Sequence, residues 1–228
     1  LISVQSLDGA PIGLLANFSM HYFGDKDISA DYFGLFSNGL QEKIAAGKPG
    51  FVAMMSHGCS GDIWRHDYEK SPERAADPIT LEQYSAQMID LAMTACGTIQ
   101  YETPESIAME ETRFALNYRV PDKQRLEWAQ RIMTELGDRP LKTQTEVYAR
   151  EQILLNELQK TEVVVQGLRL GNNISIATTP NETYALTGLK IKAASPTPHA
   201  MVIELANGGD GYIPPPEQHL LGGYNTWA

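Results

Sequence analysis

The sequence predicts a mixed α/β or α+β fold, in which helices flank a mixed β-sheet. Short apolar runs typical of buried strands recur along the chain, amphipathic helical patterns separate them, and the two kinds do not alternate strictly. The 228 residues are enough for one large domain or part of one. Because 43% of the residues are apolar and 20% are charged, the composition is that of an ordinary globular protein. We therefore expect the chain to fold.

The N-terminal part is expected to form a hairpin, a helix and a further strand. The turn dipeptide Asp8-Gly9 separates residues 2–4 from the apolar run Pro11–Phe18, a pattern typical of two antiparallel strands. Residues 35–46 have a helical pattern, and Phe51–Met55 is a short strand of the buried type. This strand runs directly into a glycine-rich turn.

Three amphipathic helices and a second group of strands follow. Thr80 and Gln83 form a capping-box pattern in front of the first helix, whose apolar residues fall on one face. The same spacing predicts the next two helices, so helices are expected over residues 81–95, 126–136 and 147–158. Strands are expected at residues 112–118, 162–169, 174–177 and 201–205, a further helix over 181–193, and a Gly- and Pro-rich loop over 206–228.

Charge and hydropathy argue against nucleic-acid binding and against a transmembrane segment. The net charge is −10, and no run of Lys or Arg forms the basic patch that nucleic-acid binding requires. No apolar run approaches the roughly 18 residues that span a bilayer, so no transmembrane segment is expected. Cys59 and Cys96 do not make a disulfide framework, and the sequence leaves open whether they pair.

Four places combine the end of a buried-type strand with polar or glycine-rich residues, the location where sites gather in mixed folds. They are Asn17–His21, His57–Asp62, Thr178–Glu182 and Asn207–Tyr212. Each also has a structural interpretation. A histidine at a strand end is commonly structural, and a glutamate in a first helical turn commonly complements the helix dipole. The glycines of the second place allow either an oxyanion site made of backbone N–H groups or a plain turn.

Taken together and in order, the four places resemble the neutral/alkaline (non-lysosomal) ceramidase family, over a stretch from about Ile12 to the C-terminus. The resemblance implies that residues 1–228 belong to a ceramidase-like catalytic domain that is truncated N-terminally and also C-terminally. The family hydrolyses the amide of N-acylsphingosine at one zinc ion, which two His, one Glu and one Tyr hold. The resemblance therefore implies Zn²⁺ as the cofactor.

Three ligands and one catalytic residue follow from this resemblance. His21, in Asn-Phe-Ser-Met-His, is similar to the family's second His ligand, and Glu182, in Pro-Asn-Glu-Thr, is similar to its Glu ligand. Tyr212, in Gly-Tyr-Ile-Pro, looks like the Tyr ligand. Tyr224 resembles a second active-site tyrosine, and the resemblance implies that a tyrosine hydroxyl, that of Tyr224 or Tyr212, stabilises the oxyanion formed when the amide carbonyl is attacked.

The chain departs from the family in two respects. Nothing in it resembles the Gly-Thr-His-Thr-His segment that contains the family's first ligand, so a further His ligand is expected upstream, in a missing N-terminal part of the same domain. We expect the chain by itself to be inactive for this reason. Trp64 stands where the family has its essential serine, and neither Cys59 nor Ser60 occupies the matching position.

The implied function is that of a zinc-dependent amidohydrolase, acting on a lipid or small N-acyl amide such as N-acylsphingosine to give a fatty acid and an amine. Trp64 leaves two alternatives open. One is a zinc hydrolase of another amide or ester, and the other is a non-catalytic relative that binds a lipid or a partner. The location of the protein cannot be read from the sequence, and only the family resemblance favours a secreted or periplasmic protein.

Overall fold

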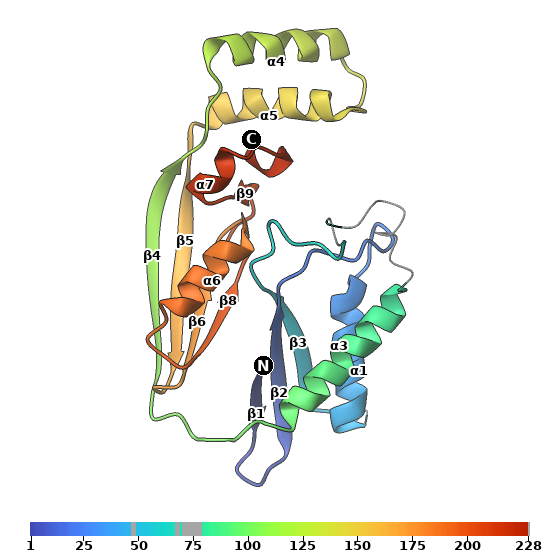
Figure 1. Ribbon diagram of the computed structural model, residues 1–228, viewed down its shortest axis with the longest axis vertical. Coiled ribbons are helices and arrows are strands. Elements are labelled where there is room, and N and C mark those ends of the chain that lie inside the picture. The colour runs from blue at the N-terminus through green and yellow to red at the C-terminus, as the bar shows by residue number, and fades with distance from the viewer. Residues whose placement is uncertain (47–48, 67–68, 70–78, 228) are drawn as a thin grey trace.

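The computed structural model describes residues 1–46, 49–66, 69 and 79–227. Two β-sheets stand side by side, and helices cover or extend them (Figure 1). A third, two-stranded sheet lies beyond the end of β8. The predicted mixed α/β architecture is confirmed, although the described strands are divided among three sheets.

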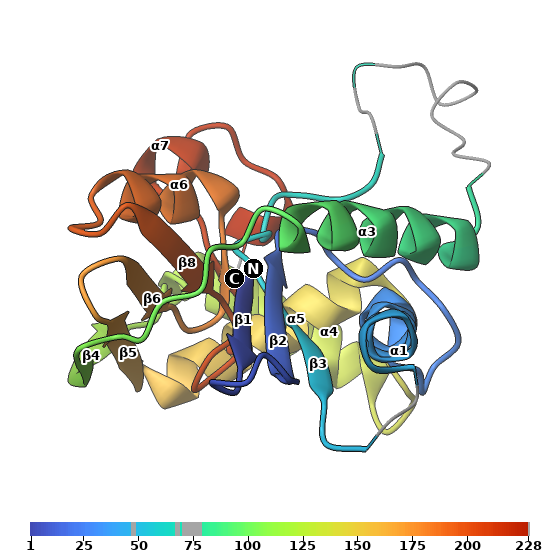
Figure 2. The ribbon, with the colours of Figure 1, turned by 90° about the horizontal axis from the view of Figure 1, so that it is seen from below.

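The first sheet has the order β1-β2-β3. β1 (Ile2–Gln5) pairs antiparallel with β2 (Pro11–Phe18), which confirms the predicted hairpin, and β2 pairs in parallel with β3 (Val52–His57). Helices α1 (Asp31–Ala45) and α3 (Leu81–Cys96) both pack on one face of this sheet (Figure 2). The capping box predicted in front of α3 is present.

A hydrophobic core lies between the first sheet and these two helices. Its buried members are Leu14, Ala16, Phe36, Leu40, Ala45, Phe51, Ala53, Ile89 and Ala92. Complete burial of one large apolar side chain stabilises the folded state by about 1.5–3 kcal/mol. The two helices approach closely at Gly39, where a Cβ atom would lie 2.3 Å from Cδ1 of Ile89. The core therefore belongs to this half of the chain.

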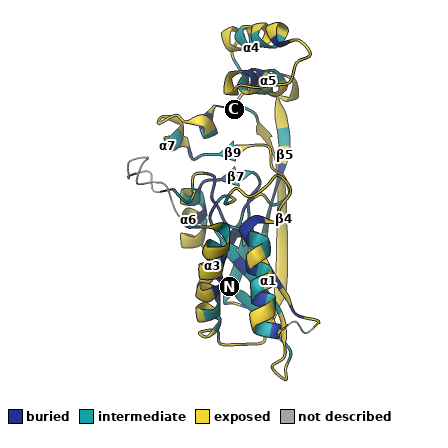
Figure 3. Ribbon diagram, turned by 90° about the vertical axis from the view of Figure 1, so that its right-hand side faces the viewer, coloured by how far each residue is buried: buried dark blue, intermediate teal, exposed yellow. Residues whose placement is uncertain are grey.

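The second sheet has the order β4-β5-β6-β8. Its strands are β4 (Ile107–Asn117), β5 (Lys160–Leu170), β6 (Ile174–Thr178) and β8 (His199–Ile203). The first three are antiparallel neighbours, and β6 pairs in parallel with β8. Every residue of the edge strand β4 is exposed (Figure 3). α6 (Ala185–Ala193) packs against β8.

Two antiparallel helices connect β4 to β5 and project from one end of the second sheet (Figure 1). They are α4 (Lys123–Leu136) and α5 (Gln144–Leu158), and we call the pair the α4–α5 arm. The pattern of apolar residues predicted both helices. α5 begins with a capping box that Thr143 and Glu146 form.

Two sequence predictions were wrong near the C-terminus. Residues Glu182–Thr183 are not the start of a helix but form β7, which pairs in parallel with β9 (Tyr212–Ile213). The backbone of Asn181 has a φ of +59°, outside the right-handed helical region, and α6 begins only after β7. The expected loop over 206–228 contains β9, α7 (Pro216–His219) and the 3₁₀ helix η1 (Tyr224–Thr226).

Two further features agree with the sequence or settle what it left open. Cys59 is buried, and both Cys59 and Cys96 are free thiols. None of the helices that the structure describes is long and apolar enough to cross a membrane.

Candidate functional site

The candidate site lies where the ends of the two main sheets meet. Nδ2 of Asn17, near the end of β2, donates a hydrogen bond to O of Val202 in β8, at 3.0 Å. N of Glu204, just after β8, donates to O of His57 at the end of β3, at 3.0 Å. These bonds join strands of the first sheet to a strand of the second. The polar segments that follow the strands are therefore brought to one place.

The backbone before His21 is held from several sides. O of Met20 accepts hydrogen bonds from Oη of Tyr32, at 2.8 Å, and from Nε2 of His57, at 2.7 Å. A carbonyl oxygen only accepts, so Nε2 of His57 must carry a proton. N of His21 donates to O of Ile63 at 3.3 Å. The imidazole of His21 thus projects from a fixed backbone.

Glu182 and Tyr212 are brought together by the short parallel pair β7 and β9. The two residues are direct partners in this pair, so their side chains lie on the same face. N of Gly61 donates to O of Thr183 at 3.0 Å, which holds β7 against the glycine-rich turn. A Cβ atom on Gly61 would lie 2.5 Å from O of Glu182. Only glycine allows this approach.

The four residues predicted for the site come together in the structure. Nε2 of His21 lies 2.8 Å from Oε2 of Glu182. The ring of Tyr212 is nearly parallel to the ring of His21, at 4° and a centroid distance of 6.4 Å. Oη of Tyr212 lies 3.1 Å from Oη of Tyr224. The predicted ligands therefore converge, and the predicted catalytic tyrosine adjoins one of them.

The charges of these groups depend on one another. The contact with Glu182 raises the pKa of His21, although burial opposes this shift. Burial raises the pKa of Glu182, but the contacts with His21 and Tyr212 outweigh burial and hold it below its ordinary value. Burial and the hydroxyl of Tyr224 raise the pKa of the Tyr212 phenol. In the absence of a cation, these shifts favour the protonated imidazole, the ionised carboxylate and the neutral phenol.

The donor atoms of this cluster fit a divalent cation. Both ring nitrogens of His21 are buried without a hydrogen-bond partner in the described chain, so the 2.8 Å approach of Nε2 to Glu182 is short without being aligned as a hydrogen bond. Two atoms that bind one zinc ion, each at about 2 Å, lie about 3 Å apart. Imidazole and oxygen donors suit zinc.

The third donor of the cluster is a phenol. No group of three His, Cys, Asp or Glu that could hold a metal occurs among the described residues, so a metal at this place would need Tyr212. The raised pKa of that phenol opposes its ionisation until a cation replaces the proton.

The backbone N–H groups of both glycines in the glycine-rich turn form hydrogen bonds within the fold. N of Gly58 donates to O of Phe18 at 2.8 Å, and N of Gly61 donates to O of Thr183 at 3.0 Å. These N–H groups are used by the fold and do not face a substrate. Of the two interpretations that the sequence allowed, the plain turn holds for both glycines.

Sequence reasoning missed a buried polar network behind the cluster. Oγ of Ser60 donates to Oε1 of Glu204 at 2.7 Å and lies 2.8 Å from Nε2 of His57. Ser60 is 0% exposed and Glu204 is 2% exposed, so neither faces solvent. Burial raises the pKa of Glu204 and lowers the pKa of His57. The only signal in the sequence was an acid at the end of an apolar strand.

Asp62, at the end of the turn, and Trp64, just after it, both form structural contacts. Oδ1 of Asp62 accepts a hydrogen bond from N of Ala185, at 2.7 Å, at the first residue of α6. The indole of Trp64 donates to O of Tyr22 at 3.2 Å and packs edge-on against His66. Trp64 is 44% exposed. Asp62 thus supports the start of α6, and Trp64 lies at the surface beside the site.

Comparison with known proteins identifies solved structures with a similar fold. No protein-family profile matches the chain, and no curated protein matches it. The crystal structure of neutral ceramidase from Pseudomonas aeruginosa is similar to it, with a TM-score of 0.67 and 17% identity over 99% of this chain and 42% of that chain. A second structure, described as ceramidase complexed with C2, gives a TM-score of 0.66 and 15% identity over 99% of this chain and 43% of that chain.

At this level of identity, the likeness shows the fold. The chain has the mixed α/β fold of part of neutral ceramidase, as the sequence resemblance implied. It spans less than half the length of the two chains that it matches.

Proposed function

We propose that this chain, which has the fold of part of neutral ceramidase, is part of a zinc-dependent amidohydrolase. The observation that supports this most directly is the approach of Nε2 of His21 to Oε2 of Glu182, at 2.8 Å, without hydrogen-bond alignment. Two oppositely charged groups that simply paired would align a hydrogen bond along the line between them. Two ligands of one cation instead point at the ion, not at each other.

His21, Glu182 and Tyr212 would hold the metal. Zinc in proteins is usually four-coordinate, and its catalytic sites leave a position open for water or substrate. We propose that a further imidazole, from a segment that precedes this chain in the natural protein, completes the ligand set, as the family resemblance implies. A zinc ion bound there would supply Lewis acidity to a carbonyl oxygen and to water.

Tyr224 is the group best placed to donate a hydrogen bond to the reacting carbonyl. Its hydroxyl lies 3.1 Å from the hydroxyl of Tyr212, and its side chain is 48% exposed, so a substrate can reach it. The oxygen of an amide carbonyl gains negative charge when the carbon is attacked, and a donor fixed at that point stabilises the charge. The role that the resemblance implies for Tyr224 is therefore compatible with its position.

Exposed apolar side chains close in sequence to His21 and Tyr224 are compatible with an amide that has a long acyl chain as the substrate. Leu220 and Leu221, just before Tyr224, are 90% and 78% exposed, and Tyr22 is 58% exposed. Ligand sites are predominantly apolar, with a few polar groups that orient the ligand. A short amide or an ester would use the same polar groups but less of the apolar surface. The second candidate, a hydrolase of another amide or ester, therefore differs in chain length or in the bond cleaved.

The test uses the natural full-length protein with N-acylsphingosine, short N-acyl amines and matched esters. We expect Tyr224→Phe to lower kcat by about 100–1,000-fold, the cost of removing one oxyanion donor, with zinc content unchanged. The control is Tyr101→Phe, because Oη of Tyr101 contacts Oγ of Ser3, outside the site. Hydrolysis that survives removal of the metal by a chelator would contradict the proposal. Bound zinc without hydrolysis of any of these compounds would favour the non-catalytic relative.

A further inference from the structure

The segment that contains Tyr224 has little structure of its own. We call residues 223–227 the Tyr224 turn. It consists of η1 and its flanks, and within it N of Thr226 donates to O of Gly223 at 2.9 Å. Gly222 and Gly223 precede Tyr224 with φ values of +75° and +101°, where glycine is conformationally free. A three-residue helix after two glycines does not fix the direction of a side chain by itself.

The α4–α5 arm and the segment between β4 and α4 hold this turn by its backbone carbonyls. Oη of Tyr148 donates to O of Tyr224 at 3.4 Å, and Nε2 of Gln152 donates to O of Trp227 at 3.3 Å. Nη1 of Arg119 donates to O of Thr226. The ring of Tyr148 also packs edge-on against the ring of Trp227, with centroids 5.1 Å apart.

The other side of the turn is tied to the candidate site. Nδ2 of Asn225 donates to O of Gly61 at 2.7 Å, and Gly61 in turn holds β7, which contains Glu182. The side chain of Tyr224 reaches the hydroxyl of Tyr212. The turn therefore lies between the arm and the metal ligands, as the position of the C-terminus between α5 and β9 shows (Figure 1).

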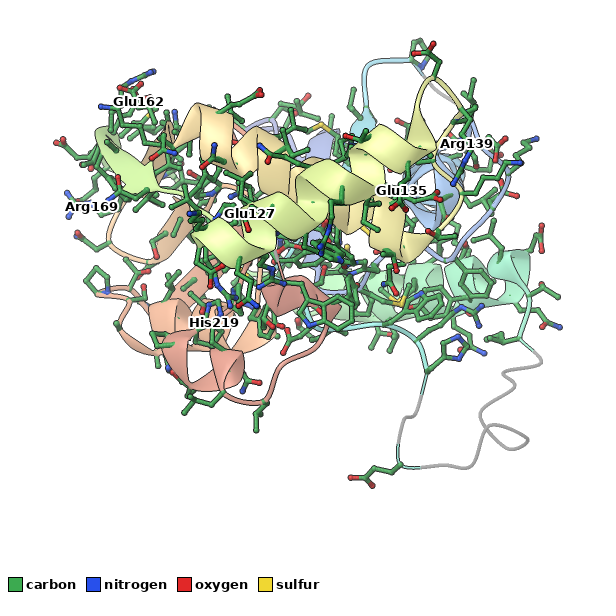
Figure 4. The ribbon with its side chains drawn as sticks, turned by 90° about the horizontal axis from the view of Figure 1, so that it is seen from above. Glu127, Glu135, Arg139, Glu162, Arg169 and His219 are labelled. Atoms are coloured by element: carbon green, nitrogen blue, oxygen red, sulfur yellow. The ribbon has the colours of Figure 1, made fainter. Side chains whose placement is uncertain are left out.

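Of the arm residues that contact the Tyr224 turn, Gln152 is the one that packing alone explains least. It is 2% exposed on α5, where its neighbours on the buried face include Ala149 and Leu155. An apolar side chain would suit a helix interface, because a buried amide without a partner costs about 1–3 kcal/mol. The amide of Gln152 is useful at this place because it reaches the carbonyl of Trp227. In Figure 4, the outer helix α4, with Glu127 and Glu135, lies over α5.

We propose that the α4–α5 arm positions Tyr224, and that Gln152 and Tyr148 are positioning residues for the site. The inference rests on the proposed function for the role of Tyr224, but the hold of the arm on the turn does not depend on that role. Loss of this hold lets the Tyr224 hydroxyl leave its place beside Tyr212. Among the described residues, no hydrogen bond or ion pair joins the arm directly to His21, Glu182 or Tyr212, so we expect zinc content to stay close to that of the parent protein.

The experiment compares Gln152→Met, which removes the amide and keeps a side chain of similar length, with Gln130→Met, the same change at an exposed position of α4. Tyr148→Phe serves as a second variant, because it removes the hydroxyl and keeps the ring against Trp227. In the natural full-length protein, amide hydrogen exchange of residues 223–227, zinc content, kcat and KM are measured. Tyr148→Phe keeps the inference testable if Gln152→Met fails to fold.

We expect Gln152→Met to speed exchange in the Tyr224 turn and to lower kcat by about 10–100-fold, the cost of misplacing a catalytic group by about 1 Å. KM and zinc content should stay as in the parent protein, and Gln130→Met should change none of these quantities. In a protein that already contains Tyr224→Phe, Gln152→Met should lower kcat no further, because the two changes remove the same contribution.

Two results would overturn the inference. One is hydrogen exchange of residues 223–227 that is unchanged in both Gln152→Met and Tyr148→Phe. The other is a loss of kcat on adding Gln152→Met to Tyr224→Phe that equals its loss in the parent protein. A parent protein without hydrolytic activity would instead defeat the proposed function. In that case exchange of residues 223–227 alone decides whether the arm holds the turn.

Discussion

The two main sheets of this protein are stabilised in different ways. The first sheet and its two helices enclose a hydrophobic core, in which Phe36 and Leu40 are 1% and 0% exposed. In the second sheet, the edge strand β4 is exposed along its whole length, and apolar side chains such as Ile107 and Phe114 are 75% and 42% exposed. The first half therefore draws its stability from buried apolar surface, whereas β4 depends mainly on its pairing with β5, in which Val163 and Val164 are buried.

This difference matters because the candidate site uses both halves. His21 follows β2 of the first sheet, whereas Glu182 and Tyr212 lie on β7 and β9, beyond β8 of the second sheet. The bonds between Asn17 and Val202, and between Ser60 and Glu204, join the halves at this point. The geometry of the site thus depends on polar contacts at a junction, not on the core of either half.

The largest expected effect tests the difference in packing. Phe36→Ala should lower the free energy of unfolding by about 3–5 kcal/mol, because it leaves a cavity in the core. Phe114→Ala, the same change on β4, should cost less than about 1 kcal/mol, since that side chain is already 42% exposed. Urea denaturation of the two variants measures both values. Equal losses would show that β4 contributes to a core and would remove the contrast.

A smaller effect is expected at the junction itself. Gly61→Ala should lower the free energy of unfolding by about 1–3 kcal/mol, because the added methyl group overlaps the backbone of Glu182 and must displace β7. The same variant should bind zinc more weakly than the parent protein. Gly167→Ala on β5 is the matched control, because a Cβ atom there meets nothing within 4 Å. Calorimetric zinc titration and urea denaturation of both variants measure the effect, and equal behaviour would contradict it.

The sequence predicted the parts of the fold that depend on local patterns. The helices α3, α4 and α5 follow from apolar spacing and capping residues, which act within a few positions. Glu182 was assigned to the first turn of a helix that was expected over residues 181–193. Its true partner, Tyr212, lies 30 residues further along the chain and is reached only through the pairing of β7 with β9.

The candidate site shows the same division between features that local sequence predicts and contacts between residues far apart in the chain. The order of four short segments identified His21, Glu182, Tyr212 and Tyr224, and the structure brings these residues together. The contact between Ser60 and Glu204 joins residues 144 positions apart, and no local sequence pattern predicts it. The contacts of Gln152 and Tyr148 with the Tyr224 turn were missed for the same reason. The assignment of zinc ligands remains a prediction.

The measurement that tests this assignment most directly is the zinc content of the natural full-length protein, purified without added metal and analysed by inductively coupled plasma mass spectrometry. Our account predicts about one tightly bound zinc per chain, as expected for a catalytic site with protein ligands. Glu182→Gln, which keeps the shape of the side chain, should weaken zinc binding by at least about 10–100-fold, a loss that even an outer-sphere change can cause. Glu217→Gln, at an exposed glutamate paired with Lys190, should leave it unchanged. A full zinc complement in Glu182→Gln, or none in the parent protein, would contradict the account.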